Sequence, residues 1–185
     1  MGRGRGGRVG LGVQNLPLTT ISPSQLPIAL DNSVVSNLHR AGALAIVLQF
    51  WSGRWLVPIY VRDEAAAWPG EGPQVLRHLE DLRERRVIDF VVFDPRSEGA
   101  TFARLSRTLG QGEGASITIA YHRHCGVALD DYPARRICNS LIPPVPLVMT
   151  EGLLRCAVTE GHLGLDDARA IWAKTGISDP RRQIL

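Results

Sequence analysis

The segment from Val127 to Arg136 reads VALDDYPARR: an apolar run stops at two adjacent aspartates, and a tyrosine, a proline and paired arginines follow. A short apolar run that stops at turn residues is typical of a buried strand, and Pro133 suits the first turn of a helix. The same order occurs in PIALDNSVVSNL, residues 27–38, where an apolar run ends at Asp31. Both segments predict a strand that ends at a carboxylate and leads into a helix.

Strand-like and helix-like patterns alternate through the rest of the chain. We expect strands at residues 28–31, 55–58, 87–93, 127–129 and 146–148. We expect helices at residues 33–51, 61–68, 74–86, 99–109, 113–124, 133–140, 151–160 and 166–174. This alternation predicts an α/β fold in which helices cover both faces of a central parallel sheet.

The composition predicts one folded domain. The chain has 185 residues, of which 44% are hydrophobic, and this suffices for a single core. Residues 1–26 are rich in glycine, arginine and proline without periodicity, which predicts a disordered leader before a domain over residues 27–185. The leader's Arg3, Arg5 and Arg8 account for the net charge of +3, because removing them from 21 basic residues leaves 18 against 18 acidic ones. The domain is therefore neutral, and its net charge does not identify a nucleic-acid partner.

Cysteine usage and hydropathy exclude several classes of protein. The three cysteines are odd in number and lack C-x-x-C spacing, which argues against a disulfide framework and against a structural zinc site. No apolar run approaches the roughly 20 residues that cross a bilayer. The N-terminal residues also lack the apolar segment of a signal peptide. We therefore expect a cytoplasmic protein without a membrane partner.

Several carboxylates are predicted to share one edge of the sheet. The carboxyl ends of parallel strands lie at the same edge, which brings Asp31 and the pair Asp130 and Asp131 together. Glu64 follows a predicted strand by about one helical turn, and Glu113 lies in the first turn of the helix before VALDD. Such a cluster is costly unless a cation neutralises it, and Mg²⁺ or Mn²⁺ prefers oxygen ligands. The pattern therefore favours metal-dependent phosphodiester chemistry, in which the metal activates water.

Each acid alone has a simpler interpretation. Asp31 and Asp131 both precede predicted helices and suit N-caps. Glu64 alone suits a surface position, and Glu113 suits a first turn, where the helix dipole favours an anion. The evidence for a site is the order, spacing and strand-end placement of the set.

Two other classes of phosphate-handling α/β protein fail at single residues. A haloacid-dehalogenase-like phosphatase needs a second aspartate two positions after Asp31, where this chain has Ser33. A response-regulator receiver needs a lysine at the end of a late strand, but the only lysine, Lys174, lies in a predicted helix. Neither class fits this sequence.

Four segments together resemble the PIN-domain family, and most closely its small prokaryotic group that includes VapC-type toxin nucleases. They are ALDNSVVSNLHRAG, VPIYVRDE, LGQGEGASITIAYHRHCGVALDDYPARR and VPLVMTEGLLRCAVTEGHL. The likeness runs from about Ile28 to Gly176. It implies a three-layer α/β/α fold around a parallel sheet, with an acidic pocket that binds magnesium or manganese.

The resemblance also assigns roles to the carboxylates. It implies catalytic residues at Asp31, Glu64, Glu113 and Asp131, and metal ligands at Asp31, Glu113, Asp130 and Asp131. Because Asp130 and Asp131 are adjacent, the register leaves open which of them is the principal ligand.

Three further residues receive supporting roles. Ser33 would orient an aspartate or a water. Arg135 and Arg136 would contact RNA phosphates, with a solvated helical face as the alternative. The chain departs from its relatives at Ala115, where a second acid is common, but no expected ligand is lost.

The resemblance implies a nuclease that hydrolyses single-stranded RNA, the toxin of a type II toxin–antitoxin pair. Its partners would be the RNA substrate, a separately encoded antitoxin and a second copy of the chain in a homodimer. A PIN-like module that binds RNA or protein without cutting is the alternative. The intact acids count against this alternative, whereas the neutral domain without a strong basic stripe favours it.

Overall fold

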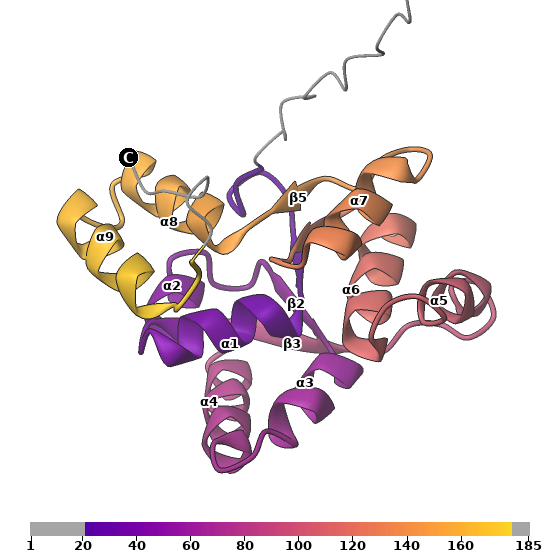
Figure 1. Ribbon diagram of the computed structural model, residues 1–185, viewed down its shortest axis with the longest axis horizontal. Coiled ribbons are helices and arrows are strands. Elements are labelled where there is room, and N and C mark those ends of the chain that lie inside the picture. The colour runs from indigo at the N-terminus through magenta and orange to yellow at the C-terminus, as the bar shows by residue number, and fades with distance from the viewer. Residues whose placement is uncertain (1–20, 179–185) are drawn as a thin grey trace, which may run out of the picture.

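The structure is a computed structural model, and it describes residues 21–178. Most of the predicted leader, residues 1–20, therefore lies outside the described residues. Within residues 21–178, five strands form one parallel sheet in the order β3-β2-β1-β4-β5 (Figure 1). The strands are β1 (Ile28–Leu30), β2 (Trp55–Pro58), β3 (Ile88–Val91), β4 (Gly126–Ala128) and β5 (Leu147–Val148).

Helices cover both faces of the sheet. They are α1 (Asn32–Arg40), α2 (Leu44–Gln49), α3 (Ile59–Ala66), α4 (Gly72–Glu84), α5 (Gly99–Leu105), α6 (Gln111–His122), α7 (Tyr132–Ser140), α8 (Thr150–Thr159) and α9 (Leu165–Lys174). Figure 1 shows α5, α6 and α7 on one side of the sheet, and α1, α2, α8 and α9 on the other. The predicted three-layer α/β/α fold is confirmed.

The strands supply two hydrophobic cores, one on each face of the sheet. Ile28 and Leu30 belong to the core beneath α1, α2 and α8, whereas Ala29, between them, belongs to the core beneath α6 and α7. Successive side chains of a strand point to opposite faces, so a strand that is buried on both faces reads as a continuous apolar run. This explains why β1, β2, β4 and β5 show no alternation with polar residues, whereas the edge strand β3 exposes Asp89.

The strand order reverses direction between β1 and β4. The chain adds β2 and β3 on one side of β1 and then returns to add β4 and β5 on the other side. Ligands of open α/β sheets bind at such a switch point, beyond the carboxyl ends of the strands. Leu30 pairs with Ala128 in the sheet, and the Asp31 N–H donates to the Ala128 carbonyl over 2.9 Å. The two segments that predicted the fold therefore end side by side.

The predicted helix over residues 33–51 is two helices in the structure. Gly42 has a φ of +67°, the left-handed conformation that ends α1. The N–H of Ala43 then donates to the Leu38 carbonyl over 2.9 Å and closes the turn. Apolar periodicity continues through this glycine, so the pattern alone did not reveal the break.

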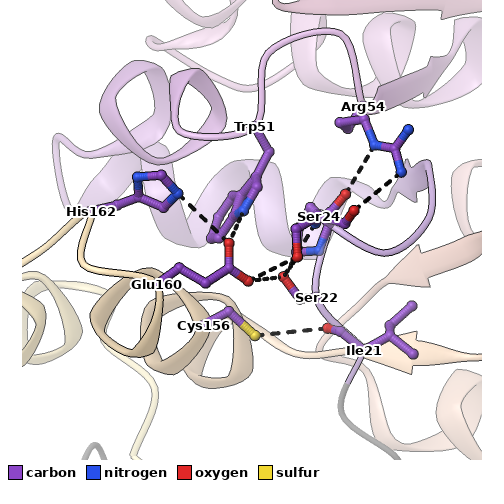
Figure 2. A network of polar contacts seen from close by, with 9 residues as sticks. Ile21, Ser22, Ser24, Trp51, Arg54, Cys156, Glu160 and His162 are labelled. Carbon is purple, nitrogen blue, oxygen red and sulfur yellow. Dashed lines mark hydrogen bonds and ion pairs between the residues drawn. The ribbon is translucent and has the colours of Figure 1, made fainter.

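Residues 21–26, the last part of the predicted leader, pack on the domain. Figure 2 shows the Glu160 carboxylate among Trp51, His162 and two serines. The Trp51 indole donates to Glu160 over 2.8 Å, the Ser24 hydroxyl donates over 3.0 Å, and the Ser22 hydroxyl also donates to it. The folded unit therefore begins before Pro27.

Within residues 21–178, no helix has the length and apolar character needed to cross a membrane.

Candidate active site

Asp31 is the most buried carboxylate of the predicted site. It follows β1 directly and caps α1, and only 1% of its surface is exposed. Its Oδ2 accepts hydrogen bonds from the Ser33 N–H over 2.9 Å and from the Ser33 hydroxyl over 2.6 Å. Its Oδ1 is buried and has no hydrogen-bond partner among residues 21–178. Burial raises the pKa of Asp31, and the hydrogen bonds from Ser33 oppose this effect without cancelling it.

Glu64 reaches the same edge of the sheet from α3. Its Oε1 accepts a hydrogen bond from the Gly112 N–H over 2.7 Å, in the first turn of α6. The first N–H groups of a helix have no partner within the helix, so this carboxylate satisfies one of them. A Cβ at Gly112 would collide with the Glu64 carboxylate. Glycine at this position therefore lets Glu64 approach the helix.

Glu113 lies next to Gly112 on α6. It is half-buried, and its Oε2 accepts a hydrogen bond from the Gly110 N–H over 3.0 Å. Burial raises the pKa of Glu113, and the negative charges of Asp31, Asp131 and Glu64 raise it further. The fold thus brings four of the predicted acids within electrostatic range of one another.

Asp131 and Asp130 use their carboxylates differently. The Asp131 Oδ1 accepts a hydrogen bond from the Ala134 N–H over 2.9 Å and caps α7. Asp130 accepts bonds from the Thr150 N–H over 3.0 Å, the Thr150 hydroxyl over 2.5 Å and the Asn37 amide over 2.6 Å. Asp130 therefore connects α1, β4 and the start of α8, a structural task that the sequence did not predict for it.

Ser33 joins the two loops that carry these aspartates. Its hydroxyl donates to Asp31 and accepts a hydrogen bond from the Asp130 N–H over 3.0 Å. One hydroxyl oxygen thus connects the β1–α1 turn with the β4–α7 turn.

A cleft of about 610 Å³ opens above these residues. Around the start of α1 it is lined by Asp31, Asn32 and Ser33, together with Glu64, Gly110 and Glu113. Ser36 and Arg40, further along α1, and Trp68, Pro69 and Glu71, after α3, complete the lining. The cleft has the volume of an ordinary small-molecule site, and three of the predicted acids stand at one end of it.

The donor set fits a hard divalent cation. Among residues 21–178, no group of three or more histidine, cysteine, aspartate or glutamate side chains is arranged to hold a metal ion by itself. Magnesium, however, keeps several waters and often binds through one or two carboxylates together with substrate phosphates. The buried Asp31 Oδ1 without a hydrogen-bond partner and the raised pKa of Glu113 both indicate carboxylates that a cation would stabilise.

The two arginines predicted to bind RNA have different surroundings. The Arg135 guanidinium lies 5.5 Å from the centre of the Tyr132 ring and donates to the Met149 sulfur. Arg135 is therefore half-buried by neighbours from the fold itself. Arg136 is exposed and lines a shallow hollow with Leu109. Of the two, the structure leaves Arg136 better exposed to a ligand.

Three residues that hold the site together were not predicted. Gly112 lies in the LGQGEG turn. A glycine directly before an acid at the start of a helix could have indicated that another group approaches the backbone there. Asn37 is a polar residue on the buried face of an amphipathic helix, which also could have indicated a buried partner. Thr150 had no such signal in the sequence, and its partner Asp130 lies 20 residues away.

The comparisons with known proteins agree with this architecture. The family model DUF3368, described as a PIN domain, matches residues 27–174, which is 148 of the 185 residues. No significant match was found among curated proteins or among solved structures.

Proposed function

Because this chain belongs to the PIN-domain family, we propose that it is a metal-dependent endoribonuclease that cleaves single-stranded RNA. PIN domains are generally nucleases and generally use divalent metals, and the chain has their nuclease-type fold. We propose further that it is the toxin of a type II toxin–antitoxin pair.

The observation that supports the proposal best is the burial of the Asp31 carboxylate. A carboxylate that is 99% buried, with one oxygen lacking a hydrogen-bond partner among the described residues, destabilises the fold in its charged form. A helix N-cap needs only one oxygen and no such burial. A cation between Asp31 and Glu113 would explain both the burial and the clustering of charge.

In the proposed mechanism, Asp31 and Glu113 hold magnesium or manganese, and Asp131 and Glu64 contribute directly or through water. The bound metal would supply a water of lowered pKa and neutralise charge that develops on the phosphate. Ser33 fixes Asp31 through Oδ2, which leaves Oδ1 for the metal. The Gly112 N–H holds Glu64 at the site through a hydrogen bond to Oε1.

The proposal assigns the principal ligand role to Asp131 rather than Asp130. Asp130 accepts three hydrogen bonds from Thr150 and Asn37, which satisfy both of its oxygens. Asp131 uses Oδ1 for its N-cap, and its charge acts on Glu113.

The toxin assignment adds partners to this mechanism. A separately encoded antitoxin would bind the domain and cover the acidic cleft, and two copies of the chain would form a homodimer. RNA as the substrate would place the activity in the cytoplasm.

A non-catalytic RNA- or protein-binding module is the second candidate. It is favoured by the N-cap bonds of Asp31 and Asp131, which give both residues a structural role without a metal.

Cleavage of a mixed single-stranded RNA pool separates the two candidates. Purified full-length protein is assayed with magnesium, with manganese and with excess chelator. Asp131→Asn keeps a good N-cap residue and is compared with Asp166→Asn, an exposed acid in the first turn of α9.

The nuclease proposal expects metal-dependent cleavage that Asp131→Asn abolishes and Asp166→Asn preserves. RNA binding without cleavage in any metal, by folded protein free of an inhibitor, would instead establish the binding module.

A further inference from the structure

The cleft extends well beyond its acidic end. Asn32, Ser36 and Arg40 are spaced four residues apart on α1, so they form one row along a single face of the helix. All three line the cleft. The opposite wall comes from Trp68 and Pro69, just after α3, a helix that packs against α1. The far end of the cleft therefore combines a polar helix face and an aromatic wall with the Glu71 carboxylate, whose Oε2 lies 3.8 Å from the His39 Nε2.

Arg40 supplies positive charge at this end of the cleft. Its Nη1 donates to the Thr175 carbonyl over 2.8 Å and to the Asn37 Oδ1 over 3.3 Å. These bonds hold the guanidinium in place at the cleft wall before any ligand arrives. Arginine presents five donors in a planar fork that matches a phosphate group, and two bonds from one nitrogen leave donors of the other nitrogens for an anion.

Trp68 supplies a large aromatic surface in the same space. It is half-buried, packs on the edge of the core beneath α1, and its ring centre lies 6.3 Å from that of His39. One part of the indole is thus fixed by packing while another part lines the cleft. Nucleobases stack on such fixed aromatic side chains with little dependence on their sequence.

We propose that this end of the cleft is a nucleotide subsite. The inference rests on the proposed nuclease function and deepens it. The base next to the scissile phosphate stacks on Trp68, the phosphate beyond it contacts Arg40, and the scissile phosphate itself lies at the cation that Asp31 and Glu113 would hold.

The subsite explains how a neutral domain holds RNA. Without Arg3, Arg5 and Arg8 the chain carries 18 basic and 18 acidic residues, so general attraction to phosphate is weak. Stacking adds affinity that does not depend on net charge. Arg40 then needs only to fix the direction in which the RNA strand runs along the cleft.

Binding of a labelled uridine hexanucleotide tests the subsite. Affinity is measured by fluorescence anisotropy with magnesium, in the Asp131→Asn background, so that the RNA survives whether or not the wild type is a nuclease. Trp68→Leu removes the aromatic face, and Trp68→Phe retains it. Trp172→Leu is the matched control, because Trp172 is a half-buried tryptophan of α9 that does not line the cleft.

We expect Trp68→Leu to weaken binding by about tenfold or more, while Trp68→Phe and Trp172→Leu bind nearly as well as the parent. Arg40→Gln should lower the slope of log affinity against log salt by about 0.7, as expected for one lost contact to single-stranded RNA. Arg85→Gln, on the exposed end of α4, should leave the slope unchanged.

The result that overturns the subsite is a folded Trp68→Leu protein that binds the hexanucleotide as tightly as its parent. A parent protein that does not bind the hexanucleotide overturns it as well. RNA cleavage by the wild type is scored separately, so a cleaving enzyme with no Trp68 effect refutes the subsite alone. A Trp68 effect without cleavage refutes the nuclease and leaves the subsite standing.

Discussion

The Glu64 carboxylate lies on the N–H of Gly112, with 2.7 Å between Oε1 and the nitrogen, where any side chain at residue 112 would displace it. One helix therefore positions an acid of the cleft by presenting bare backbone to it. The site depends on this absence of a side chain as well as on its carboxylates.

Gly112→Ala should separate activity from stability. The new methyl group meets the end of the flexible Glu64 side chain, so the carboxylate moves and the backbone does not have to. Alanine is better than glycine by about 1 kcal/mol in a helix interior, which offsets a cost of about the same size for the lost hydrogen bond from the residue 112 N–H. We expect a melting temperature close to that of the wild type and a rate of RNA cleavage that is lower by about tenfold or more.

Gly99→Ala is the control for this variant. Gly99 starts α5, and a Cβ there would meet no atom within 4 Å. Cleavage by Gly112→Ala at the rate of Gly99→Ala would show that the position of Glu64 is irrelevant to the reaction.

Asp31→Asn should stabilise the protein at neutral pH in the absence of metal. The folded protein has a raised pKa at Asp31 because of burial, so the folded state holds this proton more tightly than the unfolded state. Wild-type stability therefore falls as the pH rises from the ordinary aspartate pKa through the raised one. Asparagine keeps the N-cap and carries no charge. Thermal unfolding in chelator should show an advantage for Asp31→Asn at neutral pH that disappears in acid.

Magnesium should make the wild type more stable than Asp31→Asn at neutral pH. A ligand that binds only the folded state stabilises it by about 2.7 kcal/mol at a concentration a hundred times its dissociation constant. The wild type should gain melting temperature on addition of magnesium, and Asp31→Asn should gain much less. Equal gains by both proteins would place the cation elsewhere.

The fold was predictable because its strands end where their apolar runs end. Asp31 and Asp131 each mark the transition from a strand to a helix, and one parallel sheet brings such ends together. Helix boundaries were harder to predict. Gly42, the glycine in AGALA, ends α1 because it adopts a left-handed backbone conformation, while the apolar residues on either side of it keep the spacing of one continuous helix. Local sequence patterns therefore predict that a helix or strand exists better than they predict the residues at which it begins and ends.

The division of roles between Asp130 and Asp131 was not predictable from the sequence. Both are acids in the same turn, and the difference arises from Asn37 and Thr150, which lie 93 and 20 residues from Asp130 in the chain. The same reason applies to residues 21–26, which are held by Glu160 at a separation of 138 residues from Ser22.

Glu160→Gln should destabilise the protein, and more so at neutral than at acid pH. Burial alone would raise the pKa of Glu160, but hydrogen bonds from Ser22, Trp51 and Ser24 leave it below its usual value. A lowered carboxylate pKa contributes stability above the unfolded pKa and loses it as the pH falls through the folded one. Urea unfolding of wild type and variant should therefore differ by no more than about 1 kcal/mol at neutral pH, because solvent screens the exposed Glu160, and the two should converge in acid. Cleavage of RNA should stay at the wild-type rate, since this network (Figure 2) contains none of the proposed catalytic acids.

Asp130→Asn should lower the stability of the protein, whereas Asp131→Asn should abolish RNA cleavage, although the two residues are adjacent. In Asp130→Asn, one oxygen becomes an NH₂ group that must face a donor from Thr150 or Asn37, which costs about 1–3 kcal/mol of unfolding free energy. In Asp131→Asn the N-cap survives, so stability should stay near that of the wild type while RNA cleavage is lost. Chemical denaturation and cleavage are measured on both variants, with Thr150→Val as a second way to break the Asp130 contacts. If Asp130→Asn is as stable as the wild type but does not cleave, Asp130 is the principal ligand and the assignment of roles to this pair is reversed.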